Sequence, residues 1–265
     1  MFTHNLNPIL IDFGIISIRW YSLAYIFGFL VGWWYGKKLI QHIFISNNYK
    51  FDLKDFDDLV TYLIISVIVG GRIGYILFYN IHYYISNPFD ILKIWEGGMS
   101  FHGALVGVVL GTHIFALKKK IKTFFLLDII ACVSPIGIFF GRLANFINGE
   151  LFGKVTTMPW GVIFPKIDYM PRHPSQLYEA LLEGLVLFII LNFYIKRKNY
   201  KIGFCSSYFL IYYGVFRIIS EFYREPDIQL GYLFNFLSMG SILSICMIIF
   251  GFFILNASKK NENKS

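Results

Sequence analysis

The sequence has little charge and few cysteines for its size. Only 15% of its 265 residues are charged, whereas an ordinary soluble domain has about 25%, so the chain cannot cover a water-facing surface. Its three cysteines, Cys132, Cys205 and Cys246, all lie within apolar stretches. They lack the Cys-x-x-Cys or Cys/His spacing of a zinc or redox site. We therefore expect buried free thiols and no metal site.

Two further features are missing from the sequence. The first apolar stretch has neither the basic segment nor the small-residue cleavage site of a secretory signal peptide, so we expect no cleaved leader. No internal repeat of the kind that marks an inverted-topology transporter is present. The only low-complexity segment is the short polar tail Lys259–Ser265.

What the chain has in excess is apolar and aromatic residues. They make up 56% of the sequence, with 29 Phe and 18 Tyr, and the mean hydropathy is +0.58. About 20 apolar residues cross a ~30 Å hydrocarbon core, and the sequence has seven stretches of that kind. They fall at about 14–36, 57–79, 98–117, 124–146, 175–195, 203–223 and 231–256. We therefore predict an all-α integral membrane protein, a single membrane domain over 1–265 with seven transmembrane helices.

The basic residues predict the orientation of these helices. Fifteen Lys and Arg residues follow the first, third, fifth and seventh spans, whereas the other side has only five. Because cytoplasmic loops retain Lys and Arg, we expect an extracytoplasmic N-terminus and a cytoplasmic tail at 257–265. The segments 80–97 and 147–174 should then form a small extracytoplasmic head. This pattern explains the net charge of +8 better than nucleic-acid binding does.

Glycines recur every four positions in three of the predicted spans. Such stripes let helix backbones approach closely in lipid, so we interpret them as packing positions rather than substrate contacts. The glycines concerned are Gly28, Gly32, Gly36, Gly70, Gly74, Gly103, Gly107 and Gly111.

Several charges lie in or near apolar spans, where each costs ~2.5–3.5 kcal/mol at the bilayer centre. On the sixth span, Tyr213, Arg217, Glu221 and Arg224 have the spacing of one helix face. One interpretation is that these residues form a functional cluster. The other is that Arg217 and Glu221 form an ion pair within the helix whose only effect is to neutralise both charges. For Arg72, packing or an ion pair and a direct role in function both remain open.

Two more residues should reach the same extracytoplasmic level. Arg142, with Asn145 three residues later, ends the fourth span, and a guanidinium fork suits phosphate oxygens. Arg142 and Arg217 could together hold one anionic headgroup, although a single arginine often only extends to the interface. His102 opens the third span. A lone membrane histidine is commonly structural, but its level beside two arginines favours a function.

These residues belong to longer motifs that resemble a known family. The run Gly141–Gly153, with sequence GRLANFINGELFG, is similar to the signature of the prolipoprotein diacylglyceryl transferases. Four further blocks resemble the family in the same order along the chain, so the resemblance covers nearly all of it. They are Ile18–Tyr21 with Tyr25, Gly97–Gly103, Arg172–Glu179 and Phe216–Asp227. Ala104 departs from the second glycine that many relatives have after the histidine.

The resemblance implies a seven-helix bundle with a head in the bacterial cytoplasmic (inner) membrane. It implies phosphatidylglycerol as donor and the lipobox cysteine of a prolipoprotein as acceptor, with a thioether and glycerol 1-phosphate as products and no cofactor. The family's phosphatidylglycerol-binding arginine matches Arg142, and its other essential residues match Asn145, Tyr25, Glu150 and Gly153, which we also assign to lipid binding, together with four further residues. These four, which we assign to catalysis, are His102, Arg217, Tyr213 and Glu221.

The chemistry fits the residues. A free thiol has a pKa near 8.5, so its attack on carbon needs a base or a positive field, and arginines already in place would stabilise a leaving phosphate. Two other classes remain as alternatives: a lipid or anion transporter whose arginines only bind a headgroup, and a seven-helix receptor. The lack of repeats disfavours the first, and two arginines with a glutamate at one leaflet disfavour the second.

Overall fold

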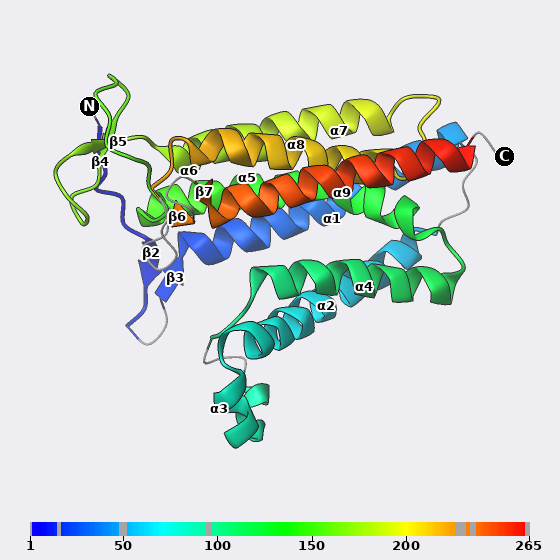
Figure 1. The fold of residues 1–265 in the computed structure, drawn as a ribbon, viewed down its shortest axis with the longest axis horizontal. Coiled ribbons are helices and arrows are strands. Elements are labelled where there is room, and N and C mark those ends of the chain that lie inside the picture. The colour runs from blue at the N-terminus through cyan, green and yellow to red at the C-terminus, as the bar shows by residue number, and fades with distance from the viewer. Residues whose placement is uncertain are drawn as a thin grey trace. The chain divides into compact units, whose positions relative to one another are not determined.

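In this computed structural model, the residues described are 2–14, 17–47, 52–93, 97–225, 232–233 and 237–262. The chain is mostly helical and forms two compact units (Figure 1). Unit 1 comprises Met1–Ser46 and Asp128–Ser265, and unit 2 comprises Asn47–Leu127.

Unit 1 contains most of the long helices. It holds all or most of each of the following helices: α1 (Trp20–Asn47), α5 (Thr123–Asn148), α6 (Ser175–Glu179), η3 (Ala180–Val186), α7 (Leu187–Ile195), α8 (Phe204–Glu221) and α9 (Met239–Glu262). α8 and α9 lie side by side (Figure 1). Two glycines make this possible: a Cβ at Gly214 would lie 2.8 Å from the Ser244 carbonyl oxygen, and one at Gly251 would lie 3.0 Å from that of Ser207. The small residues thus set the spacing of this helix pair.

The helix from Ser175 to Ile195 is interrupted by a π-helical stretch. Its central segment, η3, has the wider turn of a π-helix, with normal α-helix before and after it. π-helical turns are rare and are frequent at functional sites. η3 contains Glu183 and directly follows Glu179.

Short strands precede the first helix of unit 1 and lie in the segments between its later helices. β1 (Phe2–Thr3) pairs in parallel with β4 (Val162–Ile163), which pairs antiparallel with β5 (Pro171–Arg172). Two hairpins are formed by β2 (Ile9–Asp12) with β3 (Ser17–Arg19) and by β6 (Tyr232–Leu233) with β7 (Leu237–Ser238). The predicted head segment 147–174 therefore has strands of its own, which an all-α class does not include.

Unit 2 is a pair of long helices with two short ones between them. α2 (Leu53–Tyr79) leads through α3 (Ile81–Ser86) and η1 (Pro88–Leu92) to α4 (Phe101–Lys119). α2 and α4 pack closely, because a Cβ at Gly70 would lie 2.9 Å from the Cα of Gly107 and one at Gly74 would lie 3.1 Å from the nitrogen of Gly103. The interpretation as packing positions is confirmed for Gly70, Gly74, Gly103 and Gly107.

Several helices have the length and composition of membrane spans. Among the described residues, four meet both requirements: Leu53–Leu77, Thr123–Asn148, Ser175–Ile195 and Gly240–Lys260. α1 carries Lys37 and Lys38 shortly after Trp33, Trp34 and Tyr35, and α8 carries Arg217 and Glu221. Large apolar side chains are exposed along these helices, among them Ile65, Ile189 and Phe253. This arrangement suits a lipid environment.

Two predicted spans differ most from the helices of the structure in where they begin. The first was expected at 14–36, but α1 begins at Trp20 because the chain before it pairs in the β2–β3 hairpin. The last was expected at 231–256, but α9 runs from Met239 to Glu262, preceded by the β6–β7 hairpin. The part of the predicted tail up to Glu262 therefore continues the last helix.

Candidate active site

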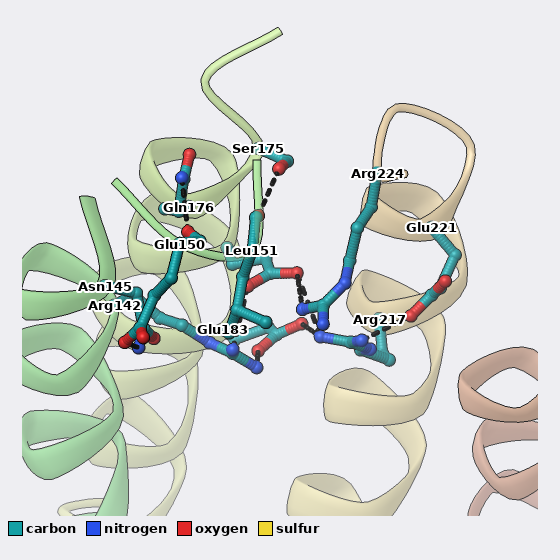
Figure 2. Close-up of polar contacts among 11 residues, drawn as sticks. Arg142, Asn145, Glu150, Leu151, Ser175, Gln176, Glu183, Arg217, Glu221 and Arg224 are labelled. Carbon is teal, nitrogen blue, oxygen red and sulfur yellow. Dashed lines mark hydrogen bonds and ion pairs between the residues drawn. The ribbon is translucent and has the colours of Figure 1, made fainter. Parts of the chain in front are cut away.

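Six buried or nearly buried ionisable side chains meet inside unit 1 (Figure 2). They come from the end of α5, from α6 and η3, and from the end of α8 and the residues after it. The members of this ionic cluster are Arg142, Glu179, Glu183, Arg217, Glu221 and Arg224. Three guanidinium groups face three carboxylates, so the cluster is formally neutral.

Glu179 is the centre of the ionic cluster. Its side chain is fully buried, and its Oε1 accepts hydrogen bonds from Arg217 Nη1 at 2.9 Å and from Arg224 Nη1 at 3.1 Å. Its Oε2 lies 2.9 Å from Arg142 Nη1 as an ion pair. One carboxylate thus fixes three arginines that come from three different segments.

Glu183 is the second buried carboxylate. Its Oε2 accepts from Arg142 Nη2 at 3.0 Å, and its Oε1 lies 3.7 Å from Arg217 Nη1. Glu179 and Glu183 are four residues apart across the start of η3. A π-helix has more than four residues per turn, so this spacing brings both carboxylates to nearly the same side of the helix, facing Arg142.

Glu221 completes the ionic cluster from α8. It accepts a hydrogen bond from Arg217 Nη2, four residues before it on the same helix. A side chain at Gly240 of α9 would overlap the Glu221 carboxylate, so the glycine leaves room for it. The predicted Arg217–Glu221 ion pair is present. It is not isolated, because Arg217 also contacts Glu179 and Glu183.

Arg224 joins the cluster from outside α8. The sequence spacing predicted one helix face from Tyr213 to Arg224, but α8 ends at Glu221. Arg224 instead lies in an extended segment that bridges to Gly153, and its guanidinium reaches Glu179 from there. The predicted helical geometry of Arg224 is therefore wrong, while its place beside Arg217 is correct.

The turn after α5 lies next to Arg142 (Figure 2). Asn145 donates its amide to Glu150 Oε1 at 2.7 Å, and Glu150 is held in turn by Gln176, which donates to its backbone carbonyl at 2.6 Å. Ser175 donates to the carbonyl of Leu151, which has a φ of 56°. Asn145, Glu150 and Arg142 are thus brought together.

Gly153 fits where no other residue would. A Cβ there would overlap the backbone carbonyl oxygens of both His173 and Tyr223. Its own nitrogen donates to His173 at 2.9 Å, and its carbonyl accepts from Arg172 Nη1 at 3.1 Å. The structure thus gives Gly153 a packing function, and its predicted contact with a lipid remains a prediction.

Arg172 clamps this loop from β5. Its guanidinium donates to Asp168 Oδ2 at 2.6 Å and to Glu225 Oε2 at 3.2 Å, and it lies over the ring of Phe152. The hydrogen bonds from Arg172 hold the pKa of Asp168 below its ordinary value. Burial lowers the pKa of the neighbouring His173.

Two tyrosines of the predicted site lie on different helices of unit 1. Tyr213 of α8 stacks on Phe209 and lies within electrostatic reach of Glu183, Arg142 and Arg217. Tyr25 of α1 is 56% exposed, and its hydroxyl lies 3.0 Å from that of Tyr21. Tyr213 therefore borders the ionic cluster, whereas Tyr25 is open to the surroundings.

The two remaining candidates belong to unit 2. His102 is the second residue of α4, but its side chain is outside the described part of the chain, and its catalytic role remains a prediction. Arg72 of α2 is buried and donates to backbone carbonyls of the segment before α4.

Sequence reasoning missed Glu179, Glu183 and Gln176 as members of the site. A signal for Glu183 was present, since it lies in an apolar stretch where a charge is costly. Gln176 and Glu179 lay inside a quoted motif, yet nothing in their spacing pointed to the arginines. The contacts that identify them join residues 26 and 38 positions apart.

The sequence of this chain matches known proteins over most of its length. A family model described as prolipoprotein diacylglyceryl transferase matches residues 8–257. The chain belongs to this family. The range that matches the prolipoprotein diacylglyceryl transferase model contains every candidate site residue named above.

The relatives named phosphatidylglycerol--prolipoprotein diacylglyceryl transferase include the following three. That of Rickettsia felis (strain ATCC VR-1525 / URRWXCal2) is 50% identical over 253 residues, covering 95% of this chain and 96% of the relative. That of Rickettsia bellii (strain OSU 85-389) is 51% identical over 253 residues, covering 95% of both. That of Ehrlichia canis (strain Jake) is 52% identical over 257 residues, covering 95% and 96%.

Proposed function

We propose that this protein transfers the diacylglyceryl group of phosphatidylglycerol to the lipobox cysteine of prolipoproteins, the first step of bacterial lipoprotein maturation. The cysteine sulfur forms a bond to the glyceryl carbon of the donor as the bond from that carbon to the phosphate oxygen breaks. The thiol proton passes to a base, and glycerol 1-phosphate leaves. The product is a thioether.

The observation that carries the proposal is the ionic cluster in a chain of this family. Within the described chain, Arg142 Nη2 donates to Glu183 Oε2, and Arg142 Nη1 forms an ion pair with Glu179 Oε2. A guanidinium has five N–H donors, so others remain for an anionic headgroup. Because Glu179 already fixes the three arginines, they can stabilise the phosphate without reorganisation as its C–O bond breaks.

Each site residue has a role in this reaction. Phosphatidylglycerol binds to Arg142, with Asn145 and Glu150 beside it, and Tyr25 contacts the lipid from α1. Gly153 holds the Glu150 turn in place by its close packing. Arg217 stabilises the leaving phosphate, and Glu221 and Tyr213 orient Arg217. His102 takes the proton from the acceptor thiol or orients the group that does so.

The same proposal places the chain in the cytoplasmic membrane with seven helices. α1, α4 and α8 then cross the membrane together with the four spans named above. Support comes from the fifteen basic residues on one side against five on the other. On this orientation the segments 80–97 and 147–174 form an extracytoplasmic head, where donor lipid of the outer leaflet and secreted precursors meet.

A direct assay tests the function. Purified protein in phosphatidylglycerol vesicles labelled in the acyl chains is incubated with a peptide that contains a lipobox cysteine. The expected result is label on the peptide that survives neutral hydroxylamine, which cleaves thioesters but leaves a thioether and the oxygen esters of the acyl chains intact, together with release of glycerol 1-phosphate. Movement of labelled lipid between leaflets without labelled peptide would contradict the proposal and favour a transporter. A Cys→Ser peptide is the matched control.

A further inference from the structure

Arg72 of α2 binds the chain segment that leads to α4, and its hydrogen bonds to the described residues of that segment are accepted by backbone carbonyl oxygens. Its Nε donates to Ile91 at 2.9 Å, and its Nη2 donates to Asp90 at 2.6 Å and to Lys93 at 3.1 Å. Its Nη1 donates to Gly97 at 2.6 Å and to Gly98 at 3.4 Å. The guanidinium thus joins two stretches, 90–93 and 97–98.

The burial of Arg72 makes these contacts energetically important. The residue is only 5% exposed, and its guanidinium lies 5.2 Å from the centre of the Tyr84 ring. A buried charge is costly unless hydrogen bonds satisfy it. The carbonyl acceptors can satisfy all five N–H groups of an arginine, whereas a lysine has three donors at a single point.

Further hydrogen bonds connect α2 to the residue that caps α4. The nitrogen of Ser100 donates to the carbonyl of Gly71, the neighbour of Arg72, at 2.8 Å. The Ser100 hydroxyl then accepts from the nitrogen of Gly103 and caps α4. The position at which α4 begins is therefore set by α2, and His102 is the second residue of that helix.

Gly98 shows how close this fit is. It has a φ of 77°, and a Cβ there would lie 2.6 Å from the Tyr75 ring and 3.0 Å from Arg72 Nη1. Gly97 also has a positive φ, 87°, but a Cβ there would meet nothing within 4 Å. Replacing either glycine by alanine therefore strains the backbone in the same way. Only the replacement of Gly98 would also place a methyl group against Arg72.

From these contacts we infer that Arg72 is a positioning residue for the transfer reaction, acting through the Gly97–Ser100 segment on His102. The inference rests on the proposed function and on the role given there to His102. It assigns a function to an arginine that touches no substrate. A mutation far from the chemistry that misplaces a reacting group by about 1 Å can cost on the order of 10²-fold in rate.

A double-mutant cycle tests the inference. Transfer to the lipobox peptide is measured per folded enzyme in detergent for Arg72→Lys, His102→Gln and the double variant. Arg72→Lys should lose about 10–100-fold in kcat/KM. Because both changes act on one group, the double variant should lose little more than His102→Gln alone. Losses that multiply, or near-wild-type activity in His102→Gln, would overturn the inference.

One matched pair of variants and one variant at a remote position separate positioning from stability. Gly98→Ala should lose activity as Arg72→Lys does, while Gly97→Ala loses much less; equal losses would overturn the inference. Lys119→Gln weakens the ion pairs of Lys119 with Asp55 and Asp58 at the other end of α2 and α4. In a double variant, the fold-loss of activity caused by Lys119→Gln should multiply with that caused by His102→Gln. Wild-type protein without transfer activity would instead refute the proposed function itself.

Discussion

Glu179 and Arg217 lie 38 residues apart in the chain and meet at 2.9 Å between Oε1 and Nη1. Glu179 ends α6 at the start of a π-helical stretch, and Arg217 lies in the last turns of α8. Because the same carboxylate also contacts Arg142 and Arg224, their positions depend on one side chain. Glu179 thereby prepares the arginines for an anionic ligand.

We predict that Glu179→Gln lowers both stability and activity. The amide keeps the shape of the side chain but leaves three guanidinium groups with one carboxylate fewer. Breaking a buried ion pair from one side costs about 3–5 kcal/mol. Thermal unfolding in detergent and the transfer assay measure the two effects. Glu225→Gln is the control, since Glu225 is 44% exposed in its pair with Arg172, and it should change little. Equal effects of the two variants would contradict the central role of Glu179.

Arg142→Lys should fail in transfer although it keeps the charge. A lysine ammonium cannot contact Glu179 and Glu183 through two nitrogens and still offer a planar fork to a phosphate. We expect a loss on the order of 10²-fold in kcat/KM, the size seen when one oxyanion donor is removed. Arg197→Lys, on the side predicted to be cytoplasmic, should keep wild-type activity. Wild-type turnover in Arg142→Lys would reduce Arg142 to a simple counter-charge.

The sequence was a good guide to Arg142 and Arg217 because of a single physical rule. A charge in an apolar helix is costly, so it marks a place where something must compensate. The rule identified both arginines, but it could not name their partners. Partner choice depends on the turn of η3 and on how the helices pack, and neither has a local signal in the chain.

The boundaries of the helices were less predictable for a related reason. Hydropathy locates apolar segments, but the residues before Trp20 are apolar enough for either a helix or a strand. The pairing of β2 with β3 decides between them, and strand pairing is a contact between segments rather than a property of one. By contrast, the glycine stripe of Gly70 and Gly74 was predictable, because close helix packing needs small residues at a fixed spacing.

Labelling from outside intact cells tests the orientation. Cys246 is exposed and should be replaced first, whereas Cys132 and Cys205 are buried. A membrane-impermeant thiol reagent should then reach Lys166→Cys, in the proposed head, but not Lys198→Cys, after α7. Both positions are exposed in the structure, so access to the residue does not distinguish them. The reverse pattern would overturn the proposed placement of the site.

The Asp168–Arg172 pair predicts a pH dependence of stability. Arg172 holds the pKa of Asp168 below its ordinary value, so the folded state favours the charged carboxylate. The stability that Asp168 contributes is therefore complete above its unfolded pKa of about 3.9 and is lost as the pH falls through the lower folded pKa. Wild type should unfold at a higher temperature than Asp168→Asn at pH 5–7, and the difference should close in stronger acid. A difference that persists there would mean that the contact does not need the charge.

His102 gives the sharpest pH test of the mechanism. If it is the base that deprotonates the acceptor cysteine, His102→Gln should lose on the order of 10²–10⁴-fold in rate near neutral pH. The loss should shrink as the pH rises toward the thiol pKa of about 8.5, because the thiolate then forms without a base. If His102 only orients a neighbouring group, the loss of rate should be the same at every pH, because glutamine then fails to hold that group whatever the pH. The measurement is kcat/KM for peptide transfer from pH 6 to 9, with Arg142→Lys as a variant whose defect should not recover. A folded His102→Gln enzyme with near-wild-type activity over this range would exclude the base role.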